Sequence, residues 1–347
     1  MGLRTLAAVA IVAAFGLTAK ADPLRIATFS PDLSRDGPGL LFRDLGRDDP
    51  QIAAVIRVIG EARPDILLLT GFDWDHDGLA LAAFQKRLGG SDLDYPYSFA
   101  ARPNAGIPTG LDLNGDGRLG GPADRQGFGR FSGQGGMAIL SRHPVGAVTN
   151  YSELLWQELA GNLMPDTPAE VAAIQRLSSV AHWDASIMVD GRPLHLLAMS
   201  ATPPVFDGPE DRNGRRNHDE LAFWLDHLPD TDFVLAGKLN IDAVDGDGRP
   251  EALSRIMDFV QDTEPRSRGG KVAGAASKNA GQKGDPALDT ADWPGARAPG
   301  NLRVDYVLPK KGLRVIGSGV LWPEGGELAD VAQEASAHRL VWVEIDW

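Results

Sequence analysis

Short apolar runs recur along the chain and predict buried β-strands. Several of them are rich in Val, Ile and Leu, and their length suits strands that are covered on both faces. They are spread over nearly the whole sequence, which favours one large domain over two small ones. The runs lie at 24–29, 65–70, 136–140, 194–199, 232–237, 303–308 and 339–345.

Helical periodicity appears between some of these runs. In 51–62, for example, apolar residues recur three or four positions apart, as on one face of a helix. The other segments of this kind are 79–88, 219–228 and 251–260. Strands and helices mixed in this order predict an α/β (α+β) fold, a four-layer sandwich of two packed mixed β-sheets flanked by helices.

Two long segments interrupt the pattern. Residues 101–135 are rich in Gly, Asp and Arg, and residues 261–300 are rich in Gly, Ala and Lys with several Pro. Loops of this length inside a domain are functional or disordered. We expect the first to be ordered around its acidic turn and the second to be mobile.

The first 21 residues have the pattern of a secretory signal peptide. Arg4 precedes an apolar run at 6–17, and Ala19-Lys20-Ala21 fits the small-x-small cleavage rule. The alternative is a membrane anchor, but the run is shorter than the ~20 residues that span a bilayer. We therefore expect cleavage near Ala21 and a periplasmic or secreted domain at 22–347.

Charge and cysteine content narrow the choice of partners. The mature chain has 32 basic and 47 acidic residues, and no cysteine. Its acidity disfavours non-specific binding to nucleic acid, although a local basic cleft can act inside an acidic protein. Without disulfides, stability after export has to come from the core. No segment of the mature chain is long and apolar enough to predict a membrane span.

Motifs at the ends of the apolar runs carry a family resemblance. Gly237-Lys238-Leu239-Asn240 follows one run, and Ser336-Ala337-His338 precedes the last. With the strand-like segments in the same order, they make the chain resemble the endonuclease/exonuclease/phosphatase superfamily, of deoxyribonuclease-like fold, in a bacterial exported branch. The remaining segments that carry the resemblance are 24–30, 64–71, 135–142, 194–200 and 303–308.

The resemblance implies metal-dependent hydrolysis of phosphoesters. In the family, carboxylates hold a divalent cation, a His/Asp pair activates water, and a further His and Asn contact the phosphate. Three positions match the family's catalytic pattern: Asn240, Asp305 and His338. Five positions depart from it: Ser30, Gly71, Ser200, Lys238 and Ala337.

The departures remove the ligands that Mg²⁺ or Mn²⁺ would need at the family site. Lys238 replaces an aspartate, and an ammonium about 4 Å from a cation repels it by several kcal/mol at an effective dielectric constant near 20. Ala337 replaces the aspartate before His338, which predicts that this histidine lacks a carboxylate partner. Two interpretations of Lys238 stay open: its ammonium binds phosphate in place of the metal, or it is solvated or ion-paired at a site that has decayed.

Two acidic stretches match the pattern D-x-[DN]-x-[DN]-G, which is the first half of a calcium-binding loop. Neither has the glutamate of the twelfth position, which is Phe84 in one and Ala123 in the other. The loop that starts at Asp112 predicts structural Ca²⁺ or a plain Asx-turn. The loop that starts at Asp73 directly follows a strand and offers displaced carboxylates for the family site. The candidate ligands are Asp73, Asp75 and Asp77, and Asp112, Asn114 and Asp116.

The segment 202–217 resembles a rim loop of the family pocket. It carries Arg212, Arg215 and Arg216, whose guanidinium groups suit phosphate oxygens. The alternative is that the arginines pair with the neighbouring acids Glu210, Asp211 and Asp219 and begin the next helix.

Three functional hypotheses result. The first is a catalytically lost or weakened phosphoesterase, a pseudoenzyme that binds a phosphorylated small molecule, a phosphodiester or a protein partner. The second is an active metal-dependent phosphodiesterase or phosphatase that uses the carboxylates of 73–77. The third is an exported binding module stabilised by calcium.

Overall fold

The computed structural model describes residues 23–293, 295 and 298–347. The whole segment predicted to be a signal peptide, 1–21, and the predicted cleavage site near Ala21 lie outside the described residues. Within the described part no helix is both long and apolar enough to cross a membrane.

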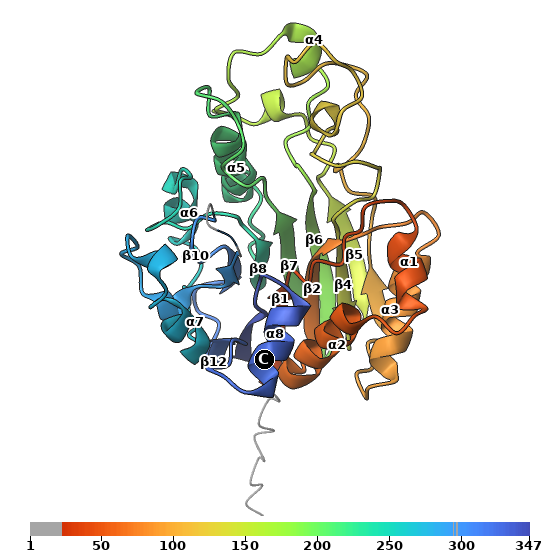
Figure 1. Cartoon of the computed structure of the whole chain (residues 1–347), viewed down its shortest axis with the longest axis vertical. Helices are drawn as coiled ribbons and strands as arrows, with labels where there is room; N and C mark the ends of the chain where they lie inside the picture. Colours follow the sequence, from red (N-terminus) through yellow and green to blue (C-terminus); the bar gives the residue numbers. More distant parts are fainter. Residues whose placement is uncertain (1–22, 294, 296–297) are drawn as a thin grey trace, which may run out of the picture.

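Two β-sheets form the centre of the domain, as predicted (Figure 1). The first has the order β12-β13-β1-β2-β4-β3 and the second the order β11-β8-β7-β6-β5, and a separate two-stranded ribbon joins β10 to β9. The first sheet comprises β1 (Pro23–Phe29), β2 (Ile66–Phe72), β3 (Tyr97–Phe99), β4 (Gly136–Ser141), β12 (Val315–Val320) and β13 (Val341–Asp346). The second comprises β5 (Val145–Asn150), β6 (Ala181–Val189), β7 (Arg192–Ser200), β8 (Phe233–Lys238) and β11 (Asp305–Pro309). The ribbon comprises β9 (Ala291–Asp292) and β10 (Asn301–Leu302).

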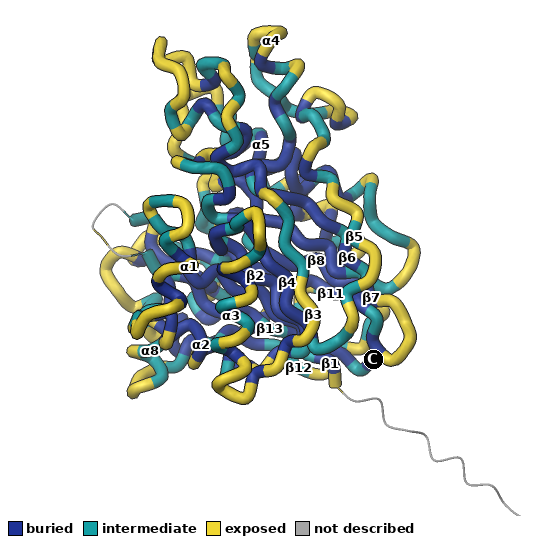
Figure 2. Tube along the Cα trace, turned by 90° about the vertical axis from the view of Figure 1, so that its right-hand side faces the viewer, coloured by how far each residue is buried: buried dark blue, intermediate teal, exposed yellow. Residues whose placement is uncertain are grey.

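Helices cover the outer faces of the sheets and complete the four layers (Figures 1 and 2). The outer core of the first sheet includes residues of α1, α2, α3 and α8, and that of the second includes residues of α5 and α6. The helices are α1 (Leu40–Leu45), α2 (Pro50–Ala62), α3 (Leu79–Gly89), α4 (Ala169–Ala172), α5 (Arg212–Ala222), α6 (Glu251–Ile256), α7 (Arg268–Ala273) and α8 (Glu327–Ala335).

The start of α2 shows how the sequence determines a helix boundary. The Asp49 carboxylate accepts a hydrogen bond from the backbone N–H of Ile52 at 3.0 Å, and Pro50 occupies the first turn, where no N–H is needed. Ile52, Val55 and Ile59 recur on the buried face and are fully enclosed. The predicted helix 51–62 is therefore confirmed almost to the residue.

Two other predicted helices have different bounds. The helix predicted at 219–228 begins at Arg212, because its first two turns bury polar side chains that apolar periodicity cannot detect. Arg216 and Asn217 are enclosed there and donate to backbone carbonyls. The helix predicted at 251–260 ends at Ile256, and Val260 instead forms a β-bridge with Lys310.

The two long segments contain defined structure. Residues 101–135 include the short 3₁₀-helix Pro122–Asp124 and a bridge between Ala105 and Gly127. The segment 261–300, expected to be mobile, contributes α7, two 3₁₀-helices and β9 to the described structure. It folds back on the chain before β13, where Ala291 bridges His338.

The layer between the sheets is the core on which the fold depends. Leu68 of β2 is fully buried there with residues of both sheets. Leu68→Ala leaves a cavity in this layer and is expected to lower the free energy of unfolding by about 2–5 kcal/mol. Denaturant unfolding followed by circular dichroism measures it.

A matched control uses a leucine on the surface. Leu79 of α3 is 48% exposed, so Leu79→Ala should change the free energy of unfolding by no more than about 0.5 kcal/mol. Equal destabilisation by the two substitutions would contradict the assignment of the inter-sheet layer as the main core.

Candidate active site

Strand alternation brings polar side chains together where the inter-sheet core stops. Side chains two residues apart on a strand share a face. Ala236 and Val307 belong to the inter-sheet core, so Lys238 and Asp305 face the same layer beyond it. The two residues are also register partners across β8 and β11. The same alternation places the side chains of Ser30, Thr70 and Ser200 in this layer.

Close backbone packing at Gly237 makes this end of β8 possible. Its φ is 141°, and an added Cβ would lie 1.9 Å from the carbonyl oxygen of Met199 on the neighbouring strand. Only glycine tolerates that approach. Gly71, in the bulge that ends β2, also has positive φ, and a Cβ there would point at the Ser30 hydroxyl at 3.4 Å. The structure thus brings together positions 30 and 71, and likewise 200, 238 and 305.

Asp305 and His338 form a buried pair. The Nδ1 atom of His338 lies 2.7 Å from Oδ2 of Asp305, and the Asp305 side chain is fully enclosed. The prediction that His338 lacks a carboxylate is therefore wrong. Its partner is not the residue before it in sequence but Asp305, which β11 places beside it. With the Nδ1 proton directed at the carboxylate, the other ring nitrogen of the neutral imidazole, Nε2, is a hydrogen-bond acceptor.

Thr290 fixes this pair, and no motif in the sequence indicated its role. Its hydroxyl donates to Oδ2 of Asp305 at 3.0 Å and accepts the backbone N–H groups of Val304 and Asp305 at 2.9 and 3.0 Å. Trp293 lies edge-on to the His338 ring, with centroids 5.4 Å apart. Both residues come from the segment 261–300, which contributes part of the site wall.

The site contains polar atoms without partners. Among the described residues, the hydroxyls of Thr70 and Ser200 and the Oδ1 atom of Asp305 are buried and make no hydrogen bond. The ammonium of Lys238 makes no ion pair there. Unpaired buried polar groups are costly and mark places where water or a ligand is bound. Lys238, with Asp305 and Ser200 as its register neighbours, contributes a cation to this layer.

The backbone conformation of Asn240, two residues after Lys238, fixes its position. Its φ is 53°, in the left-handed region that asparagine tolerates, and its N–H bonds the carbonyl of Val304 at 3.1 Å. Its side-chain amide donates to the carbonyl of Ala201 at 2.6 Å. The amide oxygen therefore has a fixed direction next to the end of β7.

Asp32 is a carboxylate at this edge that the sequence analysis overlooked. It follows β1, has φ of 51°, and its Oδ2 accepts from the Ser336 hydroxyl at 3.1 Å and the Ala337 N–H at 3.4 Å. A carboxylate therefore lies over the backbone of the position where the family aspartate is missing. An acidic residue directly after the first strand was the available signal.

In the first acidic loop, 73–77, the carboxylates of Asp73 and Asp75 accept hydrogen bonds from backbone N–H groups. Asp73 is buried, and its carboxylate accepts the N–H groups of Arg35 and Gly135 at 2.7 and 2.8 Å. Burial raises its pKa despite these bonds. Asp75 accepts the N–H groups of Leu79 and Ala80, both at 2.8 Å, and so caps α3.

This loop lines a separate cavity. The cavity has a volume of about 490 Å³ and is lined by Asp73, Asp75 and Asp77. Within the described part of the chain, no hydrogen bond or ion pair connects these carboxylates to Asn240 or His338. Their predicted use as displaced metal ligands has no support from these contacts.

The second acidic loop forms Asx-turns. The Asp112 carboxylate accepts the N–H groups of Gly115 and Gly117 at 2.7 and 2.8 Å, and Asp116 accepts that of Arg118 at 2.8 Å. Asn114 donates to Asp116 at 3.4 Å. In the residues that the structure describes, no three acidic or histidine side chains are grouped to hold a metal ion. Structural Ca²⁺ in this loop stays a prediction.

The three arginines predicted to bind phosphate contact carbonyl oxygens instead. Arg216 is buried and donates to the carbonyls of Leu177 and Gln126 at 2.8 and 2.7 Å, and burial lowers its pKa to about 10. Arg212 donates to the Leu113 carbonyl, and Arg215 to that of Leu163. These contacts anchor distant loops to α5.

Capping by Asp75 can be tested by substitution. Asp75→Ala removes the acceptor for two N–H groups at the start of α3 and is expected to cost about 1 kcal/mol of stability, as for other lost helix caps. Asp77→Ala is the matched control, because Asp77 is exposed and makes no hydrogen bond with the described residues. Denaturant unfolding measures both. Equal effects would contradict the capping role.

Asp289, which precedes Thr290, gives the site a pH-dependent stability. Burial, with Asp242 and Asp245 nearby, raises the pKa of its carboxyl to about 7. The folded state therefore holds this proton up to about pH 7, whereas an unfolded aspartate loses it near pH 3.9, so the carboxyl lowers stability progressively as the pH rises from about 4 to 7.

Asp289→Asn should accordingly stabilise the protein at pH 8 by roughly 1–3 kcal/mol, after allowance for screening by solvent. At pH 5 the carboxyl is protonated in the folded parent, so the advantage of the variant should be clearly smaller than at pH 8. Urea unfolding at the two pH values measures the difference. A gain that is the same at both would contradict the raised pKa.

Comparison with known proteins agrees with this architecture. The chain matches the model of the endonuclease/exonuclease/phosphatase family over residues 37–338. A search of curated proteins finds no match. Among solved structures, an endonuclease/exonuclease/phosphatase from Beutenbergia cavernae is 19% identical with a TM-score of 0.57, and the alignment covers 93% of this chain and 71% of the other.

Two further structures share the fold. A family protein from Leptotrichia buccalis is 15% identical, with a TM-score of 0.51 and coverage of 93% of this chain and 100% of the other. An AP endonuclease from Archaeoglobus fulgidus is 13% identical, with a TM-score of 0.50 and coverage of 93% and 100%. The family model covers most of the chain, and the predicted resemblance is confirmed: this protein belongs to the endonuclease/exonuclease/phosphatase family.

Proposed function

We propose that this protein is an exported family member that binds a phosphate ester through Lys238 without a divalent cation, and that its hydrolytic activity is lost or much weakened. The ligand's phosphate accepts hydrogen bonds from the ammonium and from the hydroxyls of Thr70 and Ser200. The observation that carries the proposal is an ammonium that makes no ion pair with the described residues, at the register position beside Ser200, whose buried hydroxyl has no partner.

The residues present do not fit the metal that the family implies. Mg²⁺ prefers six oxygen ligands, several of them carboxylates or water. Asp305 is the carboxylate that faces the inter-sheet layer here, and one of its oxygens is already bonded to His338 and Thr290. Lys238 adds a positive charge at the register position opposite Asp305. The charge of the site therefore favours an anion over a cation.

The rest of the site supports binding of a phosphoryl group. Lysine serves as a point charge for phosphate, and hydrogen bonds to a charged group are stronger than neutral ones. The polar atoms without partners lie at the end of an apolar layer, where water screens charge less than at the surface. A phosphate would satisfy both hydroxyls and balance the ammonium.

A second candidate, slow hydrolysis, is favoured by one observation. The Asp305–His338 pair is assembled, with Nε2 of His338 available to accept a proton from water. Such turnover would use the pair as a general base and would not need a metal ligand set. The same experiments distinguish it from binding alone.

The proposal is tested by binding of inorganic phosphate and p-nitrophenyl phosphate, measured by calorimetry in the presence of a chelator. Lys238→Met keeps the length of the side chain but removes its charge, and it is expected to weaken binding at least tenfold, as lost charged hydrogen bonds do. Arg215→Met, which removes a charge outside this site, is the matched control and should leave the affinity within about twofold.

Turnover of bis-p-nitrophenyl phosphate with Mg²⁺, Mn²⁺ or Ca²⁺ decides the alternatives. Chelator-sensitive hydrolysis that disappears in His338→Ala would overturn the proposal and establish a metal-dependent enzyme. Chelator-resistant hydrolysis lost in the same variant would support the second candidate. A rise in melting temperature with Ca²⁺ and no phosphate binding would instead support the calcium-stabilised module.

A further inference from the structure

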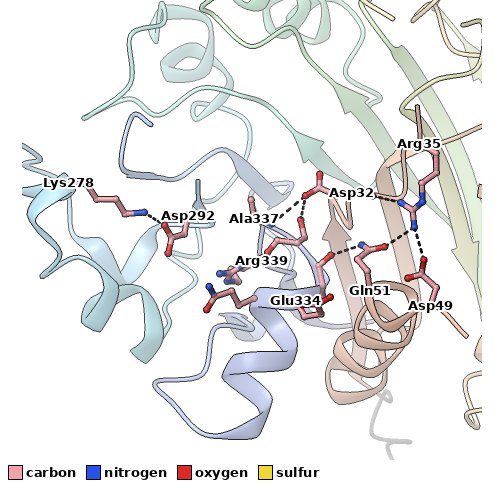
Figure 3. Close-up of a pocket in the computed structure, with 12 residues that line it drawn as sticks. Asp32, Arg35, Asp49, Gln51, Lys278, Asp292, Glu334, Ala337 and Arg339 are labelled. Atoms are coloured by element: carbon pink, nitrogen blue, oxygen red, sulfur yellow. Dashed lines mark hydrogen bonds and ion pairs between the residues drawn. The ribbon is translucent and has the colours of Figure 1, made fainter. Parts of the chain in front are cut away.

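A second cavity lies outside the inter-sheet site. It has a volume of about 810 Å³ and lies between the end of β1, the end of α8 and the segment 261–300 (Figure 3). Its walls are polar and carry charges of both signs. Asp32, Ser336 and Ala337 line it at the edge of the first site, but neither Lys238 nor His338 does.

Arg339 is a buried cation in the wall of this cavity. Its residue is 4% exposed, and its guanidinium lies over the Trp322 ring, 4.7 Å from the centroid. One nitrogen, Nη1, donates to the carbonyls of Ser336 and His338 and so closes the end of α8. The Nε atom is buried and has no hydrogen-bond partner among the described residues.

The charge of Arg339 lacks an ionic partner, unlike the other cations of the wall. Arg35 pairs with Asp44 at 3.2 Å, and Lys278 pairs with Asp292. No carboxylate of the described residues lies within ion-pair distance of Arg339. Guanidinium stays charged at any physiological pH, and a buried charge without a counter-ion is unfavourable. The cavity therefore has a position for an anion.

The opposite side of the cavity carries free acidic groups. Glu334 is exposed and forms no ion pair in the described structure. The Asp32 carboxylate accepts only from neutral donors, the Ser336 hydroxyl and the Ala337 N–H. Figure 3 shows both acids on the side of the guanidinium that faces β1 and α2. They would repel a phosphate dianion but would attract an ammonium group.

We propose that this cavity binds a small amino-acid-like zwitterion. Its carboxylate lies against the guanidinium of Arg339, whose planar donors match a carboxylate. Its ammonium lies toward Asp32 and Glu334. This site is independent of phosphate binding at Lys238, because the two sites use different side chains.

The experiment titrates the mature protein, at constant ionic strength, with each of the proteinogenic amino acids, and with acetate, methylamine and inorganic phosphate. Calorimetry is expected to show saturable binding of at least one amino acid, at least tenfold tighter than acetate or methylamine. Arg339→Lys keeps a charge that can close α8 but removes the planar donors, and should weaken this binding at least tenfold.

Two surface variants keep the test independent of folding. Asp32→Asn suits the left-handed backbone, and Glu334→Gln changes an exposed side chain. Each should reduce the preference for the amino acid over acetate at least threefold and leave the melting temperature unchanged. Lys238→Met should leave this binding preference unaltered. The proposal is overturned if no amino acid binds saturably, if only phosphate does, or if Arg339→Lys and both acid variants bind as the parent does.

Discussion

The apolar layer between the two sheets is the constraint on which the site depends. The alternation that buries Ala236 and Val307 also directs the side chains two positions away on each strand inward. Where the layer stops, those side chains are Lys238 and Asp305, so a change of register by one residue would turn them to the outer face. The core therefore determines which residues can form the site.

Hydrogen bonds stabilise the buried carboxylate at this end of the layer. Asp305 is fully buried, and its carboxylate accepts a hydrogen bond from Thr290 and pairs with His338. Lys238 is its register partner on β8, and its ammonium makes no ion pair with the described residues. In the function that we propose, this positive charge is therefore open to an anionic ligand.

The sequence predicted the sheets well and the site only in part. Apolar runs such as 65–70 predicted β2 and the other six strands, because buried strands need continuous apolar residues. Half-exposed strands such as β5 and β12 lack that signal and were not predicted. The first turns of α5 were also not predicted, because their buried side chains are polar and bind carbonyl groups of distant loops.

The Asp305–His338 pair explains why motif positions alone misled. The sequence motif associates His338 with its neighbour at 337, and alanine there suggested an isolated imidazole. The structure pairs it with a residue 33 positions away: Asp305 begins β11, and His338 lies just before the start of β13.

Thr290 could not have been predicted by any local rule, since it lies in a segment without apolar periodicity and acts through two hydrogen bonds to the backbone and one to Asp305. The orientation of His338 therefore depends on Asp305 and Thr290, and it is compatible with an ammonium at position 238. In the function that we propose, Lys238 selects an anionic ligand, and the geometry around His338 determines whether water can be activated beside it.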